Sequence, residues 1–184
     1  MAHRLEAATS GRAKCRACGQ PIAKGDERLG ESLPNPYSEG EMTLWFHPRC
    51  GAYKRPETML EALRALEDTP ARAELAALAE SGLGHRRVPR LDAAERAPSG
   101  QARCRSCRAP IAKGTWRARL TFFEEGGRFN PGRFIHLGCV RAYCELSDDA
   151  DLEPILARLL HFGHTLSAAD AAEVRAAVVT DATA

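Results

Sequence analysis

Long apolar runs and lysine are both scarce in this 184-residue chain. No apolar stretch approaches the ~20 residues that a membrane helix needs, and the polar start MAHRLEAATSGRAK differs from a secretory signal. These two absences predict a protein of the cytosol that does not contact membranes. The chain has 4 Lys against 22 Arg, and this bias, with abundant alanine, favours a bacterial origin.

Cysteine is the informative residue. The chain has 7 Cys, and paired thiols in a reducing compartment hold metal more often than they form disulfides. Length alone is compatible with one ordinary domain or with two small ones.

An internal repeat decides between these two possibilities. Gly11–Gly25 matches Gly100–Gly114 at 10 of 15 positions with an offset of 89, and the same offset relates the later His-x2-Cys motifs. Each copy therefore contains Cys-x2-Cys, 28 residues and His-x2-Cys. The predicted ligands are Cys15, Cys18, His47 and Cys50 in the first copy and Cys104, Cys107, His136 and Cys139 in the second.

Three thiolates and one imidazole form a closed tetrahedral zinc site with no open position for water. We therefore expect two structural zinc ions per chain and no catalytic role for either. The alternatives, buried free cysteines or disulfides, do not explain a histidine at the same place in both copies. Cys144 lies outside both motifs and is interpreted as a buried or idle thiol.

The expected fold is a pair of small α+β zinc-finger modules in tandem. Each module would have a zinc knuckle, a two-stranded hairpin and a short helix, followed by a helical pair with apolar residues at intervals of three and four. Leu63 and Leu156 are predicted to be buried in these helices. The predicted boundaries are 1–56 for finger 1, 57–82 for helical pair 1, 83–101 for a linker, 102–145 for finger 2 and 146–184 for helical pair 2.

Local signals refine this outline. Trp116–Phe122 alternates as a strand should, and Glu125–Arg128 is predicted to form the turn that follows. Pro34–Gly40 in the first copy is predicted to be a loop. Thr69-Pro70 and Ser167 are predicted helix starts.

Formal net charge is +2, and two zinc ions with six bound thiolates bring it to about zero. The distribution says more, because the fingers are basic and the helical parts acidic. Gly11–Pro56 has 8 Lys/Arg against 5 Asp/Glu, whereas Glu57–Gly82 has 2 against 6. This polarity favours a local basic patch over a general nucleic-acid coat, although arginines on a solvated surface would give the same counts.

The two Cys3His motifs and the residues around them resemble the zinc fingers of poly(ADP-ribose) polymerases, which also occur beside a DNA ligase catalytic domain. The resemblance lies in Ser10–Cys15, Cys15-x2-Cys18, Ile22-x-Lys24, Arg28 and Trp45-Phe-His47-x2-Cys50, and most of it repeats in the second copy. The family's fingers recognise DNA strand breaks, with arginines on phosphates and loop hydrophobics stacked on an exposed base pair. No segment resembles a polymerase or ligase catalytic domain.

Carried over to this sequence, the resemblance implies a DNA-binding set. Its members are Arg12, Lys24, Arg28, Pro36, Tyr37, Arg103, Lys113 and Arg117. The second copy has Gln101 in place of Arg12 and glycines at the stacking tip, so it is expected to bind more weakly or to contact protein. The sequence thus predicts a non-enzymatic, nucleoid-associated protein that binds nicked or broken duplex DNA. The alternative is a zinc-stabilised protein-interaction scaffold or a recruiter of a DNA repair enzyme.

Overall fold

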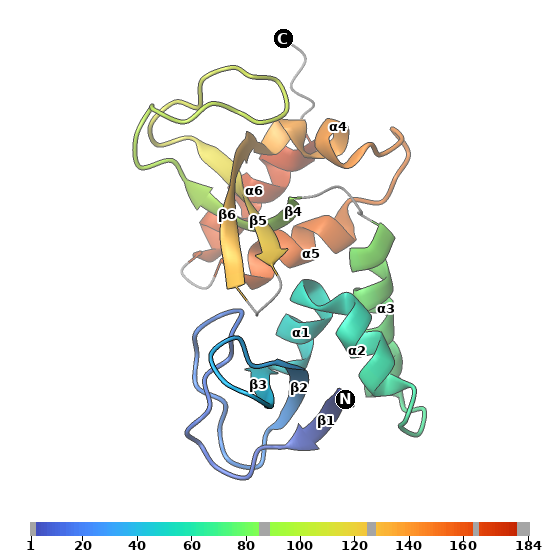
Figure 1. The fold of residues 1–184 in the computed structure, drawn as a ribbon. Helices are drawn as coiled ribbons and strands as arrows, with labels where there is room; N and C mark the ends of the chain where they lie inside the picture. The colour runs from blue at the N-terminus through green and yellow to red at the C-terminus, as the bar shows by residue number, and fades with distance from the viewer. Residues whose placement is uncertain (1–2, 85–88, 125–127, 164–165, 180–184) are drawn as a thin grey trace. The chain divides into compact units, whose positions relative to one another are not determined.

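A computed structural model describes residues 3–84, 89–124, 128–163 and 166–179. Over these residues, no helix combines the length and the apolar character needed to cross a membrane. The chain divides into two compact units. The first module holds elements β1 to α3, and the second holds β4 to α6 (Figure 1).

The first module is built on a three-stranded antiparallel sheet in the order β1-β2-β3. Its strands are β1 (Arg4–Ala7), β2 (Glu27–Pro34) and β3 (Glu41–Phe46). The register pairs Leu5 with Leu29 and Leu29 with Phe46, so apolar residues alternate onto one face. That face forms part of the core, where Leu29 and Phe46 are fully buried.

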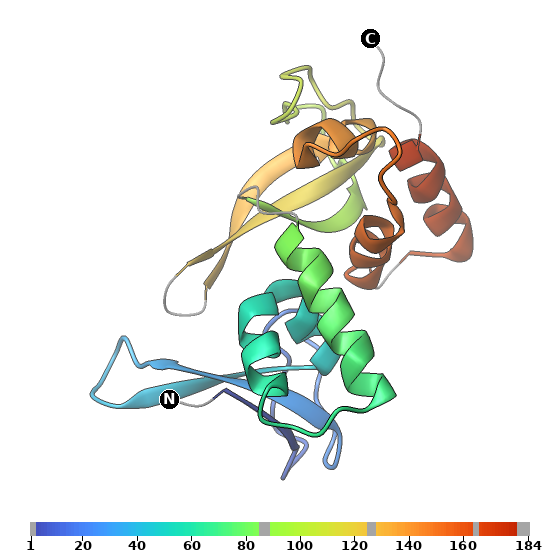
Figure 2. The same cartoon turned by 90° about the vertical axis from the view of Figure 1, so that its right-hand side faces the viewer.

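Three helices follow the sheet: α1 (Pro48–Lys54), α2 (Pro56–Leu63) and α3 (Pro70–Gly84). Figure 2 shows them together on one side of the first module's sheet. Gly51 of α1 lies so close to β2 that a Cβ there would be 2.6 Å from Leu29 Cδ2. Met59 and Ala79 complete the core from α2 and α3.

The second module repeats this plan. Its sheet has the order β4-β5-β6, formed by β4 (Arg90–Arg96), β5 (Trp116–Glu124) and β6 (Arg128–His136). A 3-10 turn (Leu137–Cys139) leads into α4 (Val140–Cys144), and α5 (Glu153–His161) and α6 (Ala168–Val179) follow. The core is continuous from Leu120 and Ile135 in the sheet to Leu159 and Val174 in the helices.

The predicted linker 83–101 is wrong. Its first two residues close α3, and β4 occupies 90–96 with Leu91, Ala93 and Ala94 buried. The sequence predicted a two-stranded hairpin in each module, but the structure has a three-stranded sheet. The additional edge strand is β1 in the first module and β4 in the second, and both lie before the repeat motif. Each module thus begins about ten residues before its finger motif.

The helices largely follow the sequence. Ser167 caps α6 as predicted, since its Oγ accepts a hydrogen bond from Asp170 N at 3.1 Å while Asp170 Oδ2 accepts from Ser167 Oγ at 2.7 Å. Leu156 is buried as predicted. Leu63 is only half-buried, because α2 ends at that residue and Met59 and Ala62 fill the core in its place.

The strand predicted at Trp116–Phe122 lies within β5. The loop predicted over Pro34–Gly40 is wrong at its first residue, because Pro34 ends β2 and pairs with Glu41 of β3. The turn predicted at Glu125–Arg128 falls mainly on residues 125–127, which lie outside the described residues. Arg128 itself is the first residue of β6.

Candidate metal centre

The first two ligands of the first module lie on a tight turn. Gly19 N donates to Cys15 O at 2.8 Å, and Gly19 adopts a φ of +76°, which glycine reaches without steric cost. The turn points both Cys15 and Cys18 at one place. Cys15 is buried and Cys18 half-buried.

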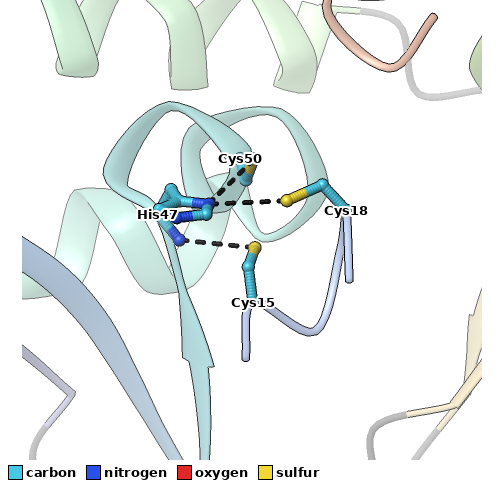
Figure 3. A group of neighbouring side chains, drawn as sticks. All are labelled: Cys15, Cys18, His47 and Cys50. Atoms are coloured by element: carbon cyan, nitrogen blue, oxygen red, sulfur yellow. Dashed lines mark hydrogen bonds between the residues drawn. The ribbon is translucent and has the colours of Figure 1, made fainter. Parts of the chain in front are cut away.

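The other two ligands lie where β3 passes into α1. His47 is the extended residue before the helix, and Pro48 at the first helical position suits the fixed φ of proline. Cys50 follows one turn later, so the helix places its sulfur beside the imidazole. Figure 3 shows all four side chains converging from these two segments.

The distances fit a tetrahedral ion. The four ligand atoms lie within 4.8 Å of one another. His47 Nδ1 is 3.4 Å from Cys18 Sγ and 4.0 Å from Cys50 Sγ. Zinc bound at ordinary Zn–S and Zn–N lengths would separate a sulfur and a nitrogen by about 3.6 Å. The residues therefore match the size and chemistry of zinc.

A hydrogen bond at the second ring nitrogen of His47 fixes the orientation of the imidazole. Its Nε2 lies 3.2 Å from Pro21 O, so a proton on Nε2 is donated to that carbonyl and the lone pair of Nδ1 faces the thiols. The backbone N–H of His47 also donates to Cys15 Sγ at 3.4 Å. These contacts orient the ligands from outside the coordination sphere.

The second module reproduces this geometry. His136 Nδ1 is 3.4 Å from Cys107 Sγ, its Nε2 is 3.2 Å from Pro110 O, and its N–H donates to Cys104 Sγ at 3.4 Å. One backbone difference lies at the knuckle, where Arg108 occupies the position of Gly19 and adopts a φ of +67°.

Crowded thiols shift one another's ionisation. A hydrogen bond from Cys50 lowers the pKa of Cys15 to about 4, and the same contact raises the pKa of Cys50 far above its usual value. In the second module, burial raises the pKa of Cys139 to about 12. A divalent cation would relieve this conflict, because it stabilises all three thiolates at once.

Both predicted tetrads are confirmed as two Cys3His zinc sites, and Cys144 belongs to neither. Each site has four protein ligands and no position left for water, so the zinc is structural. Metal binding then contributes directly to the folding free energy of each module.

The predicted DNA-binding residues are placed in two different environments. Arg12, Lys24, Pro36 and Tyr37 are exposed in the first module, as are Arg103 and Lys113 in the second. Arg28 and Arg117 are instead buried, at 6% and 5% exposure. Their burial weighs against the direct phosphate contacts that the resemblance implied for them.

The side chains that contact these two arginines were not predicted from the sequence. Arg28 lies against the Trp45 ring and donates to Glu6, and Arg117 lies against Phe134 and donates to Glu95. The 89-residue offset also relates Glu6 to Glu95, so extending the repeat comparison upstream of Gly11 would have found this pair.

The architecture and the two tetrads define a tandem zinc-finger protein of the Cys3His type. Residues 6–78 match the model of the "Poly(ADP-ribose) polymerase and DNA-Ligase Zn-finger region". The first module, from β1 into α3, is therefore similar to this zinc-finger region.

Two longer proteins are also similar to this chain. The chain is 33% identical over 134 residues to poly [ADP-ribose] polymerase 1 of Gallus gallus, covering 62% of this chain and 13% of that protein. It is 26% identical over 159 residues to poly [ADP-ribose] polymerase 1 of Oryza sativa subsp. japonica, covering 83% of this chain and 15% of that protein. The chain thus spans a small fraction of the length of these relatives.

Proposed function

We propose that this protein binds DNA at strand breaks, through backbone and shape contacts, and performs no chemical step itself. Fingers of this family recognise breaks, and the observation that carries the proposal here is Tyr37. This side chain is 80% exposed, although aromatic rings ordinarily bury most of their surface. A ring in that position can stack on the base pair that a nick or an end uncovers.

The loop that holds Tyr37 is ordered by its own hydrogen bonds. Asn35 Oδ1 accepts from Tyr37 N at 3.0 Å, Asn35 Nδ2 donates to Ser38 Oγ at 2.8 Å, and Asn35 N donates to Gly40 O at 3.0 Å. Pro36, next to the ring, restricts the backbone further. A preorganised loop loses little conformational entropy on binding.

Phosphate contacts fall on the exposed cations. Arg12 and Lys24 lie on the loops of the first module, and Arg103 and Lys113 occupy comparable loops of the second. Contacts of this kind position a protein on DNA without reading its sequence. A protein with such a role in a bacterial cell would be associated with the nucleoid.

A second candidate is a scaffold that recruits a repair enzyme. It is favoured by exposed carboxylates on and beside the helices of each module. They are Glu57, Glu61, Glu74 and Glu80 in the first module and Asp151, Glu153 and Glu173 in the second. A basic partner would complement them.

The test compares one sequence in three forms: closed circle, nicked circle and blunt linear duplex. We expect Kd to be tighter for the nicked and linear forms than for the closed circle at the same salt concentration. Equal Kd on all three forms would exclude break recognition while leaving DNA binding intact. The absence of binding below micromolar to any form would favour the scaffold.

A further inference from the structure

Both sheets carry the same stack of an acid, an arginine and an aromatic ring, one residue from each strand. In the first module, Glu6 Oε1 accepts from Arg28 Nη2 at 2.6 Å, and Arg28 Cζ lies 3.5 Å from the centroid of the Trp45 ring. In the second, Glu95 Oε1 accepts from Arg117 Nη2 at 2.5 Å, and Arg117 Cζ lies 3.4 Å from the centroid of the Phe134 ring.

The residues beside these stacks differ between the modules. In the first, Arg4 of β1 lies opposite Gly30 of β2, and Arg4 Nε donates to Glu6 Oε2 at 2.8 Å. In the second, Asp92 and Ala93 of β4 lie between the paired residues Leu91 and Ala94. Arg119 alone lies between their partners on β5, so β4 has a β-bulge that inserts one extra residue.

This bulge supplies an extra carboxylate. Arg119 donates from Nε to Asp92 Oδ2 at 2.9 Å and from Nη1 to Glu95 Oε2 at 3.3 Å. Two arginines therefore meet two carboxylates in the second module. In the first, Arg4 and Arg28 share the single carboxylate of Glu6.

The stacked arginine also makes fewer hydrogen bonds in the first module than in the second. Arg117 donates both Nε and Nη2 to Glu95, whereas Arg28 Nε is buried and has no hydrogen-bond partner among the described residues. A buried donor without an acceptor is unfavourable, so the stacked arginine is less completely hydrogen-bonded in the first module than in the second. Arg4 and Arg119 are comparably exposed, at 44% and 42% of their side chains, so access does not distinguish them.

We propose that Asp92 is a specificity-determining residue: it holds Arg119 away from the phosphodiester backbone, so that only the first module's sheet, through Arg4, engages phosphate. This inference rests on the proposed function. It explains why a second module with the same zinc site and the same stack would contribute less to DNA binding. The discriminating feature is the number of carboxylates that pair with the two arginines: Glu6 alone for Arg4 and Arg28, against Glu95 and Asp92 for Arg117 and Arg119.

The test measures the affinity of the full chain for one nicked duplex between 0.05 and 0.3 M salt. Replacing Asp92 with Asn keeps the side-chain shape and removes the charge. Because one added phosphate contact changes the slope of log K against log salt by about 0.9, we expect a steeper slope and roughly fivefold to tenfold tighter binding near 0.1 M salt. Glu95→Gln should give a smaller gain in the same direction.

Two controls separate this effect from a general loss of negative charge. Asp148→Asn removes an exposed carboxylate from a turn of the same module and should leave the slope unchanged. Arg119→Gln added to Asp92→Asn should abolish the gain. In the first module, Arg4→Gln should lower the slope by about 0.9. Zinc content and thermal unfolding confirm that each variant is folded.

The outcomes distinguish the two proposals. If neither Asp92→Asn nor Glu95→Gln tightens binding, or if Asp148→Asn tightens it equally, the inference about Asp92 is overturned while wild-type break binding stands. If the wild-type chain shows no preference for breaks but Asp92→Asn gains a phosphate contact that requires Arg119, the proposed function fails and the inference holds.

Discussion

Arg55 Nε donates to both carboxylate oxygens of Glu31, each at 2.8 Å, inside the first module. Glu31 is 1% exposed, and Thr58 Oγ1 donates to the same carboxylate at 2.7 Å. The corresponding positions of the second module are Leu120 and Cys144. The two modules therefore join sheet to helices by different means, a buried ion pair in one and apolar packing in the other.

The contribution of the Glu31–Arg55 ion pair to stability can be tested by introducing the residues that the second module has at these positions. Glu31→Leu alone leaves Arg55 without its carboxylate, and we expect a loss of about 3–5 kcal/mol in the free energy of unfolding. Glu31→Leu combined with Arg55→Cys gives the first module the second module's residues at these two positions and should recover most of that loss. Chemical denaturation measures both. A double variant no more stable than the single one would show that apolar residues cannot replace the ion pair in the first module.

Zinc stoichiometry tests the independence of the modules. Elemental analysis should find two zinc ions per chain, because each tetrad is complete within its own module. Cys50→Ala should leave one ion and unfold the first module, and Cys139→Ala should do the same to the second. Loss of both ions from either variant would contradict this prediction.

Acid should release the metal. Protons compete with zinc for the thiolates, and burial raises the pKa of Cys139 to about 12, so at neutral pH that thiol must give up its proton when zinc binds. The raised pKa of Cys50 has the same consequence in the first module. We expect proton release on zinc binding at pH 7 by calorimetry in two buffers of different ionisation enthalpy, and zinc affinity that falls as pH falls. Equal affinity at pH 5 and pH 7 would contradict the thiolate ligand set.

The knuckles offer a matched pair of backbone substitutions. Arg108 has a φ of +67° where the first module has Gly19 at +76°. Arg108→Gly should raise thermal stability, by roughly 0.5–1 kcal/mol, because it relieves a strained conformation at some cost in unfolded-state entropy. Gly19→Arg should lower it. Stabilisation by Gly19→Arg would mean that side-chain contacts outweigh backbone conformation at this turn.

Tyr37 and Arg12 should affect DNA binding differently. Tyr37→Ala should cost about 1–3 kcal/mol, the scale of base–aromatic stacking, only on DNA with an exposed base pair, and should leave the salt slope unchanged. Tyr37→Phe keeps the ring and serves as the control. Arg12→Ala should weaken binding to every DNA form and lower the slope by about 0.9. Fluorescence titration at several salt concentrations measures each. An unchanged slope for Arg12→Ala with zinc retained would remove Arg12 from the interface.

The ligand set could be predicted from the sequence because spacing alone constrains a metal site. Two residues between Cys15 and Cys18 permit only a tight turn, and two between His47 and Cys50 permit one helical turn, so the geometry is local. Because the same spacings occur in both copies of the repeat, the same ligand geometry could be predicted for both sites. The helix starts were predictable for the same reason, since capping by Ser167 involves only its near neighbours.

The edge strands and the buried arginines could not be predicted in this way. Arg90–Arg96 is rich in charge and follows the sequence Gly82-Leu-Gly-His-Arg-Arg87, so it resembles a connector. Its pairing with β5 depends on residues twenty or more positions away. The environment of Arg28 depends on Glu6 and Trp45, which come from two other strands. Family resemblance supplied a role for this arginine but no information about its neighbours.

The contact between Trp45 and Gly30 limits the order in which two duplicated modules could have diverged. A Cβ on Gly30 would lie 2.6 Å from Trp45 Cζ3, so a larger residue at that position requires the indole to shift. The second module has Arg119 and Phe134 at the corresponding positions. A lineage moving between the two states one substitution at a time would therefore be favoured to pass through a smaller ring opposite glycine, because arginine opposite tryptophan would displace the indole.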